Sequence, residues 1–360
     1  MAPPGALCAA RRPALSPVVD AHTHLYPRWY LDRLRDHAGL PRLRGARGRE
    51  RLVMFAGEDA RGDGGGRPID EGYWEPEAKT AFLVREGIDQ ALVSMGNPWL
   101  EPFAGPESVE LAWRVNEELG GLEAATGGRL CGMAVVPADE VEPAVAVAAH
   151  VARTPGLHGI VSGTRLCGRL LDDDALDPLW DTLQRAGVPL FLHPHHAVAT
   201  EELAGFGHAA PVGLGFPFET TVALWRLVLG GVLERFPDLA ILAAHGGGTV
   251  PFLAGRMDAA WQSDPSVRTR LSHPPSEDLA RLHLDAVLYH PRAMRAAAGL
   301  VGAGRIVYGT DHPFSVADPA ANRAAVERAF AGGELEEVLG GVAARLFGLP
   351  APAGGAVMPA

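Results

Sequence analysis

Short apolar runs alternate with longer amphipathic stretches along most of the chain. Two of the longer stretches have helical periodicity: residues 172–187 carry acids in the first turn and stop at Gly187, and residues 217–237 end at Pro237. The short runs have strand length and occupy residues 17–22, 88–94, 129–137, 157–163, 188–194, 239–245, 281–287 and 305–311. Strands that alternate with helices indicate βαβ units and a parallel sheet.

The number of runs favours a barrel over an open sheet. Eight strand-helix units in about 300 residues fit a (β/α)8 TIM barrel, and no Gly-rich dinucleotide-binding turn follows the first run. The predicted fold class is therefore α/β, with a barrel over residues 17–348. A Gly- and Arg-rich insertion at about 30–75 follows the first strand, either as a lid over the site or as a disordered surface loop. We expect residues 1–16 and 349–360 to be a disordered leader and tail.

The amino-acid composition limits which binding partners and which cellular compartment we expect. The 360 residues are 47% hydrophobic and 21% charged, with a net charge of −11, which argues against nucleic acid or an anionic membrane as a partner. We expect no apolar run of membrane-spanning length. Cys8, Cys131 and Cys167 have no paired spacing, so we predict a reduced, cytoplasmic setting and no cysteine-based metal site.

Histidines and one aspartate recur at the ends of the predicted strands. The run "VVDAHTHLYP" contains His22 and His24, which share one side of a strand and can therefore aim at one point. His193, His245 and Asp311 end the fifth, sixth and eighth runs, and in a parallel barrel all these ends meet at the face where active sites lie.

Nitrogen and oxygen donors of this kind suit a divalent metal. The pair in "HTH" alone is as compatible with an ordinary turn as with a metal site, but together with the other strand ends it predicts one. Zn²⁺ is the favoured ion, with Mn²⁺ or Fe²⁺ as alternatives. Asp20 shares the parity of the two histidines but lies deeper, as a supporting acid. His312 should point away from Asp311 and is not a predicted ligand.

Several spaced blocks resemble a known family. They are "DAHTHLYP", "FLHPHH", "GFPFETT" with the helix after it, "HGGG" and "GTDHPF". Together they resemble the decarboxylase branch of the amidohydrolase superfamily, typified by 2-amino-3-carboxymuconate-6-semialdehyde decarboxylase. Blocks such as "GRP" and "GNPW" look most like isoorotate (uracil-5-carboxylate) and 6-methylsalicylate decarboxylases. The resemblance runs from about Val18 to Gly348.

The resemblance implies roles for individual residues. The implied ligands of a single metal are His22, His24, His193 and Asp311, and the implied catalytic residues are His245 and Asp311. The implied substrate contacts are Arg67, Asn97, His195, Phe216, Phe314 and Arg256. In this family the arginine equivalent to Arg256 comes from the neighbouring subunit, which implies a homodimer. Without the resemblance, Arg67 could equally be solvated, Asn97 a turn residue before Pro98, and the two phenylalanines core residues.

Three functions remain at this stage. The leading prediction is a metal-dependent non-oxidative decarboxylase of an aromatic, heteroaromatic or muconate-type carboxylic acid. The alternative is a single-metal hydrolase of an amide or lactone that uses an activated water. No lysine signal for a bridged two-metal site follows the fourth run, and Asp264 stands about where the aminocarboxymuconate enzyme has a further basic residue. A barrel that only binds a ligand is the weakest of the three readings, because every expected metal ligand is present.

Overall fold

Eight parallel strands form the centre of the molecule. The computed structural model describes residues 17–351, so the predicted leader and all but the start of the tail lie outside the described residues. The strands follow one another around the sheet in chain order. They are β1 (Val19–His24), β5 (Gln90–Ser94), β6 (Leu130–Ala134), β7 (Leu157–Ser162), β10 (Leu190–Leu192), β11 (Ile241–Ala243), β12 (His283–Asp285) and β13 (Ile306–Val307). Each overlaps one of the eight apolar runs, and β1 continues two residues beyond its run, so the predicted (β/α)8 fold is confirmed.

The first and last strands meet and close the sheet. The backbone N–H of Ala21 donates to the Tyr308 carbonyl at 2.9 Å, and that of Asp311 donates to the His22 carbonyl at 2.7 Å. A parallel bridge joins Thr23 to His312 beyond the end of β13. The carboxyl ends of β1 and β13 therefore lie side by side, which brings residues from both ends of the chain to one rim.

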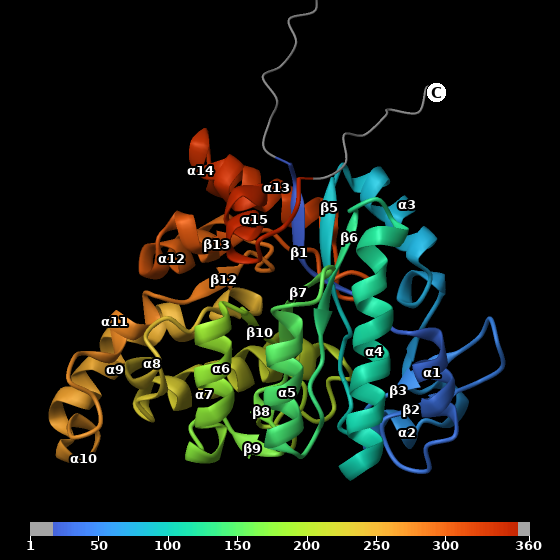
Figure 1. The fold of residues 1–360 in the computed structure, drawn as a ribbon, viewed down its shortest axis with the longest axis horizontal. Coiled ribbons are helices and arrows are strands. Elements are labelled where there is room, and N and C mark those ends of the chain that lie inside the picture. The colour runs from blue at the N-terminus through green and yellow to red at the C-terminus, as the bar shows by residue number, and fades with distance from the viewer. Residues whose placement is uncertain (1–16, 352–360) are drawn as a thin grey trace, which may run out of the picture.

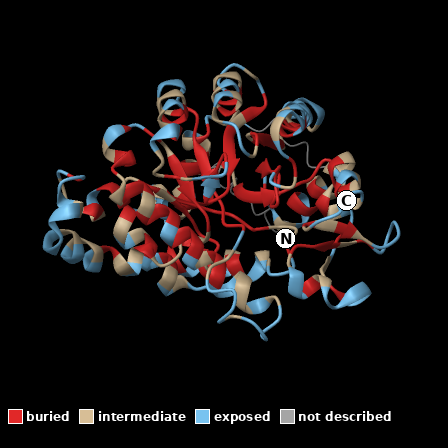
Figure 2. Cartoon of the chain, turned by 90° about the horizontal axis from the view of Figure 1, so that it is seen from below, coloured by how far each residue is buried: buried red, intermediate tan, exposed pale blue. Residues whose placement is uncertain are grey.

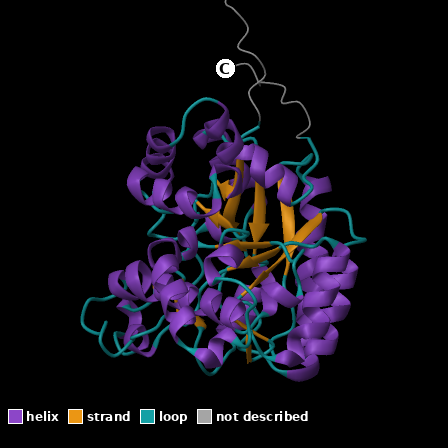
Figure 3. Ribbon diagram, turned by 90° about the vertical axis from the view of Figure 1, so that its left-hand side faces the viewer, coloured by secondary structure: helices purple, strands orange, loops and turns teal. Residues whose placement is uncertain are grey.

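Helices surround the strands and bury their outer faces (Figure 3). Each barrel strand leads into one long helix, and the buried residues gather on the strands and on the inner faces of the helices (Figure 2). These helices are α3 (Pro76–Glu86), α4 (Gly105–Ala125), α5 (Val141–Val151), α6 (Asp177–Ala186), α7 (Phe216–Leu229), α9 (Val250–Ser263), α12 (Pro291–Val301) and α13 (Pro319–Ala329). The shorter helices are α8 (Val232–Arg235), α10 (Pro265–Arg268), α11 (Pro275–Leu279), α14 (Gly333–Glu336) and α15 (Val342–Leu346).

The two helical stretches expected from the sequence differ in outcome. Helix α6 ends where predicted, with Gly187 in the left-handed conformation at φ 64°. The stretch 217–237 is not one helix, because it breaks between α7 and α8. Gly231 has a φ of 71° there, and a Cβ on Gly230 would lie 2.4 Å from the Cβ of Asp172. The helix therefore breaks where the backbone at Gly230 packs against the side chain of Asp172.

One segment has the length and apolar composition of a membrane-spanning helix. Residues 211–229, which include α7, reach a mean hydropathy of 1.2, so the expectation that no run has this length is wrong. Of its most apolar window of 18 residues, 56% is buried inside the protein. Helix α7 follows β10 in the ring around the barrel, and a buried core helix passes the same composition test.

The insertion after β1 is folded. It contains helix α1 (Arg28–Arg35), helix α2 (Ala56–Asp59) and a three-stranded antiparallel sheet of β2 (Arg42–Arg44), β3 (Arg51–Val53) and β4 (Arg67–Pro68). These elements lie together beside α4 (Figure 1). Glu50 is buried and accepts from the guanidinium groups of Arg28 and Arg35, which ties the sheet to α1. We call residues 30–75 the inserted subdomain.

Candidate metal centre and active site

Four side chains converge at the carboxyl ends of three barrel strands. His22 and His24 end β1, His193 follows β10, and Asp311 follows β13. The Nε2 atoms of His22 and His24 lie 3.1 and 3.3 Å from Oδ1 of Asp311. All three Nε2 atoms and this Oδ1 are buried and have no hydrogen-bond partner within the described part of the chain. We call these four residues the metal cluster.

The other nitrogen of each imidazole is held in place. Nδ1 of His22 lies 2.6 Å from Oδ2 of Asp285, and Nδ1 of His193 lies 2.8 Å from the Pro194 carbonyl oxygen. Nδ1 of His24 lies 3.0 Å from Oγ of Ser94. Donation from Nδ1 leaves the lone pair on Nε2, so each ring presents an acceptor atom to the shared point.

Asp285 is a functional residue that the sequence analysis missed. It ends β12, accepts from the backbone N–H of Gly246 at 3.0 Å and fixes the orientation of His22. An acid at the end of a buried predicted strand was the available signal. Ser94 at the end of β5 was missed in the same way.

The charges at the metal cluster favour a cation. Burial alone would lower the pKa of His22, but the carboxylates of Asp311 and Asp285 raise it to about 10. Burial lowers the pKa of His24 to about 4 and that of His193 well below its ordinary value. Burial would raise the pKa of Asp311, yet the surrounding imidazoles hold it well below its usual range. Two buried carboxylates therefore stabilise positive charge where the Nε2 atoms meet.

These residues fit a divalent metal ion. Two ligand atoms of a tetrahedral zinc ion with bonds of about 2.0–2.1 Å lie about 3.3 Å apart. The distances from Asp311 Oδ1 to the two imidazoles of β1 match that separation. Three imidazoles and a carboxylate also suit Zn²⁺, Mn²⁺ and Fe²⁺ by ligand type. The orphaned atoms are thus explained if this cluster holds such an ion.

His245 lies beside the metal cluster. Its Nε2 is 3.7 Å from Oδ2 of Asp311, and Nε2 or Nδ1 of His245 lies within 4.8 Å of ligand atoms of His22 and His193. The backbone places it there through the turn that follows, in which Gly248 has a φ of 65° and a Cβ would lie 2.1 Å from the Pro217 carbonyl oxygen. The "HGGG" block therefore serves to bring a histidine to the site.

A small cavity of about 30 Å³ lies against the metal cluster. It is lined by Arg67, Asn97, His193, His208, Val212, Phe216, His245, Asp311, Phe314, Ser315 and Val316. The guanidinium carbon of Arg67 lies 4.2 Å from the centre of the Phe314 ring, and Phe314 stacks on His24 with ring centres 4.7 Å apart. Arg67 also donates to Oδ1 of Asn97 at 3.3 Å, while its buried Nε has no partner among residues 17–351.

The structure thus brings Arg67, Asn97, Phe216 and Phe314 to the cavity with His245 and Asp311. His195 is buried but does not line it, because its Nε2 lies 3.3 Å from Oε2 of Glu101. Arg256 is exposed on α9, away from the cavity of its own chain. His208, which was not among the predicted site residues, does line the cavity.

Asp20 and His312 also lie near the metal cluster, and both make hydrogen bonds to residues outside it. Asp20 accepts from the hydroxyl and backbone N–H of Thr310, and burial raises its pKa to about 6. His312 lies 2.6 Å from Nζ of the buried Lys79, which also donates to Oγ1 of Thr23 at 2.9 Å. His312 therefore points away from the metal cluster, as predicted.

Comparison with known proteins yields one family and several relatives. The amidohydrolase family model matches residues 19–349. A 2-amino-3-carboxymuconate-6-semialdehyde decarboxylase of Dictyostelium discoideum is 27% identical over 290 residues, which cover 79% of each chain. A crystal structure of IDCase from Metarhizium anisopliae in apo form superposes with a TM-score of 0.87 at 30% identity, over 94% of this chain and 98% of that one.

A more distant structure shares the fold. It is a 5-carboxyvanillate decarboxylase of Novosphingobium aromaticivorans with bound manganese, at a TM-score of 0.74 and 20% identity, over 93% of this chain and 97% of that one. These matches confirm the resemblance that the sequence blocks indicated.

Proposed function

The chain belongs to the amidohydrolase family, and on that premise we propose that it is a metal-dependent, non-oxidative decarboxylase of an aromatic or heteroaromatic carboxylic acid. The relatives support a carboxy-lyase over a hydrolase, because those described above are named decarboxylases although their family is named for hydrolysis. A muconate-type acid is the other substrate class. Asp264, where a further basic residue would serve it, instead accepts from the backbone N–H of Ser266 at the start of α10.

The arrangement of Arg67 is the observation that carries this proposal. Its guanidinium carbon lies over the Phe314 ring, its buried Nε lacks a partner among the described residues, and the cavity it lines ends at the metal cluster. A guanidinium group binds planar carboxylate or carbonyl oxygens in pairs. A flat anion that lies along Phe314 can therefore meet Arg67 at one end and the metal cluster at the other.

The reaction breaks the bond between a ring carbon and its carboxylate, leaves the electron pair on that carbon and replaces the lost group with a proton. A divalent metal bound at the cluster would hold the developing negative charge on a substrate oxygen as a Lewis acid. His245 and Asp311 lie side by side at the cavity, and either can pass on the proton, although Asp311, whose pKa is held low, must first take one up. Arg67 and Asn97 orient the anion, while Phe216 and Phe314 exclude water from the ring.

For the metal we propose Zn²⁺, with Mn²⁺ and Fe²⁺ as competitors. Three imidazoles favour Zn²⁺ by ligand type, whereas the manganese in the relative from Novosphingobium supports Mn²⁺. Reconstitution of metal-free protein with each ion separately decides between them. The ion that gives the highest rate at one equivalent is the functional one.

The active form that we propose is a homodimer in the cytoplasm. Arg256 is exposed on α9 and would complete the substrate site of the neighbouring subunit. Cys131 and Cys167 are both unpaired and buried, in keeping with a reducing compartment. Mixing an Arg256→Ala protein with an Asp311→Asn protein tests the shared site, because hybrid dimers should regain activity in one of their two sites.

A screen for CO₂ release tests the function. Metal-loaded protein is offered uracil-5-carboxylate, 6-methylsalicylate, other salicylates, hydroxyanthranilates and the aminocarboxymuconate semialdehyde. We expect CO₂ release without incorporation of solvent oxygen from at least one aromatic or heteroaromatic acid. Hydrolysis of an amide or lactone without CO₂ release would overturn the proposal in favour of the hydrolase.

A further inference from the structure

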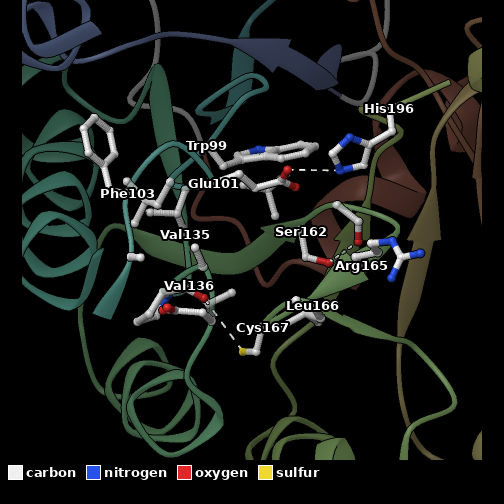
Figure 4. Close-up of a pocket in the computed structure, with 18 residues that line it drawn as sticks. Trp99, Glu101, Phe103, Val135, Val136, Ser162, Arg165, Leu166, Cys167 and His196 are labelled. Atoms are coloured by element: carbon white, nitrogen blue, oxygen red, sulfur yellow. Dashed lines mark hydrogen bonds and ion pairs between the residues drawn. The ribbon is translucent and has the colours of Figure 1, made fainter. Parts of the chain in front are cut away.

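A second group of histidines and a carboxylate lies beyond the metal cluster. Glu101 follows β5 and His195 and His196 follow β10, and we call these three residues the outer cluster. Glu101 and His196 lie at a cavity of about 280 Å³ between the loops after β5, β6 and β7 (Figure 4). Trp99 lines the same cavity, and its ring centre is 5.9 Å from that of His193 and 5.5 Å from that of His195.

The outer cluster has the internal spacing of a metal site. Oε2 of Glu101 lies 3.3 Å from Nε2 of His195 and 3.0 Å from Nε2 of His196. The metal cluster has the same spacing, at 3.1 and 3.3 Å. Both imidazoles are adjacent in the sequence yet present the same nitrogen to one oxygen atom. Two histidines and one carboxylate are a ligand set that zinc sites use, with a fourth position left for water.

The backbone holds the outer cluster in this arrangement. The carboxylate of Glu219, on α7, accepts from the backbone N–H of His195 at 3.1 Å and from that of Ala197 at 2.7 Å. The side chain of Glu219 is buried, so these hydrogen bonds restrain the loop that carries both imidazoles. The Nδ1 atom of His195 is buried and has no partner within residues 17–351. A metal on Nε2 would leave the ring hydrogen on this atom.

A third cluster has similar residue types but lacks these properties. In the group of Glu123, Cys131 and His158, Nε2 of His158 lies 2.6 Å from Glu123, closer than either imidazole of the outer cluster lies to Glu101. Burial raises the pKa of the Cys131 thiol to about 12, whereas a thiol must lose its proton to bind a metal. This third cluster therefore serves as a matched control.

We propose that the outer cluster binds a second divalent transition-metal ion, such as Zn²⁺, more weakly than the metal cluster does. The outer cluster has three ligands and two of them are partly exposed, with side-chain exposures of 31% for Glu101 and 48% for His196. The metal cluster has four ligands, all buried. The Trp99 ring packs against both His195 and His193, so we expect occupation of the outer site to disturb a ligand of the metal cluster and an excess of Zn²⁺ to inhibit decarboxylation. This inhibitory consequence rests on the proposed function, whereas the binding itself does not.

Metal stoichiometry tests the binding. Metal-free full-length protein is dialysed against rising concentrations of Zn²⁺, and bound metal is counted by elemental analysis. We expect a tight first equivalent and a second about 100-fold weaker. Glu101→Gln and His196→Ala should keep the first and lose the second, while His158→Ala should keep both. Co²⁺ gives an independent readout, because the second equivalent should add visible bands that His196→Ala lacks.

The outcomes separate the two claims. A single equivalent in the wild-type protein, or a second equivalent that survives in both Glu101→Gln and His196→Ala, overturns the outer site. If the second equivalent binds and Zn²⁺ excess lowers CO₂ release about tenfold in the wild type but not in His196→Ala, the inhibitory role holds. Binding of two equivalents without any decarboxylation would refute the proposed function and leave the outer site standing.

Discussion

The barrel rim and the inserted subdomain contribute to the same cavity in different ways. The rim supplies the metal cluster from strand ends that are fully buried and individually anchored. The inserted subdomain supplies Arg67 from a two-residue edge strand, and charged pairs such as those of Glu50 hold its sheet to α1. Under the proposed function, the difference teaches that the chemistry would be built on the rigid core, while a peripheral sheet that can vary independently would contribute to substrate selection.

The strongest test of this comparison is Asp311→Asn on the rim. The change removes a ligand and a proton donor without altering size, so we expect metal loss and a fall in kcat/KM of at least about 10⁴-fold. Metal content and CO₂ release measure both effects. Asp264→Asn is the control, since this exposed acid caps α10. If Asp311→Asn keeps its metal and a substantial rate, the barrel rim does not supply the catalytic groups as we propose.

A second test concerns an anchor rather than a ligand. In Asp285→Asn the amide no longer holds the Nδ1 hydrogen of His22 as a carboxylate does, so metal affinity should fall about 10- to 100-fold. Competition with a chelator of known affinity measures the change. Activity should return at high metal concentration, which Asp311→Asn should not show. Unchanged affinity would mean that the rigidity of the strands alone orients His22.

On the inserted subdomain, Arg67→Lys should change binding more than turnover. A lysine keeps the charge but loses the planar pair of donors and the stacking on Phe314, so we expect KM to rise about tenfold with a smaller change in kcat. Arg44→Lys, on β2 of the same sheet, is the matched control and should leave KM unchanged. If kcat falls as much as kcat/KM, Arg67 acts in the chemical step, and the inserted subdomain is not confined to substrate binding.

The smallest effect is expected for Glu50→Gln. This change weakens the contact of the sheet with Arg28 and Arg35 and should lower the free energy of unfolding by about 1–2 kcal/mol, with metal content unaffected. Hydrogen bonds from Arg28 outweigh burial and lower the pKa of Glu50 in the folded protein. Its stabilisation is therefore present above the ordinary glutamate pKa and is lost as the pH falls through the lowered value. Thermal melts of both proteins across this range should converge at acid pH; a constant difference would contradict the assignment.

The sequence predicted the barrel rim far better than the inserted subdomain. Apolar runs of strand length locate every barrel strand, and parity places His22 and His24 on one side of β1. The strands β2 to β4 have two or three residues each and are rich in arginine, so no apolar alternation marks them. Each of β2 and β3 buries a single leucine, Leu43 or Leu52, and the arginines of β2 pair with a residue outside the sheet, neither of which a sequence pattern shows.

Within the site, ligands were easier to predict than the residues that hold them. His193 and Asp311 end recognisable runs, whereas Asp285 and Ser94 look like ordinary strand residues until their partners on β1 are known. His195 does not line the small cavity, because its Nε2 pairs with the carboxylate of Glu101. This contact joins two loops that lie far apart in the sequence. The contribution of Arg256 to a second subunit stays a prediction, since it depends on a partner chain.

The seam between β1 and β13 has a consequence for how the protein is made. The metal cluster draws two ligands from the first strand and its carboxylate from the segment after the last, with almost the whole described chain between them. During synthesis, the imidazoles of β1 emerge early, whereas the carboxylate of Asp285 follows only with β12 and that of Asp311 only after β13. A metal ion can then bind all four ligands only when the barrel is complete. A bound ion would stabilise the closed contact between β1 and β13 against local unfolding.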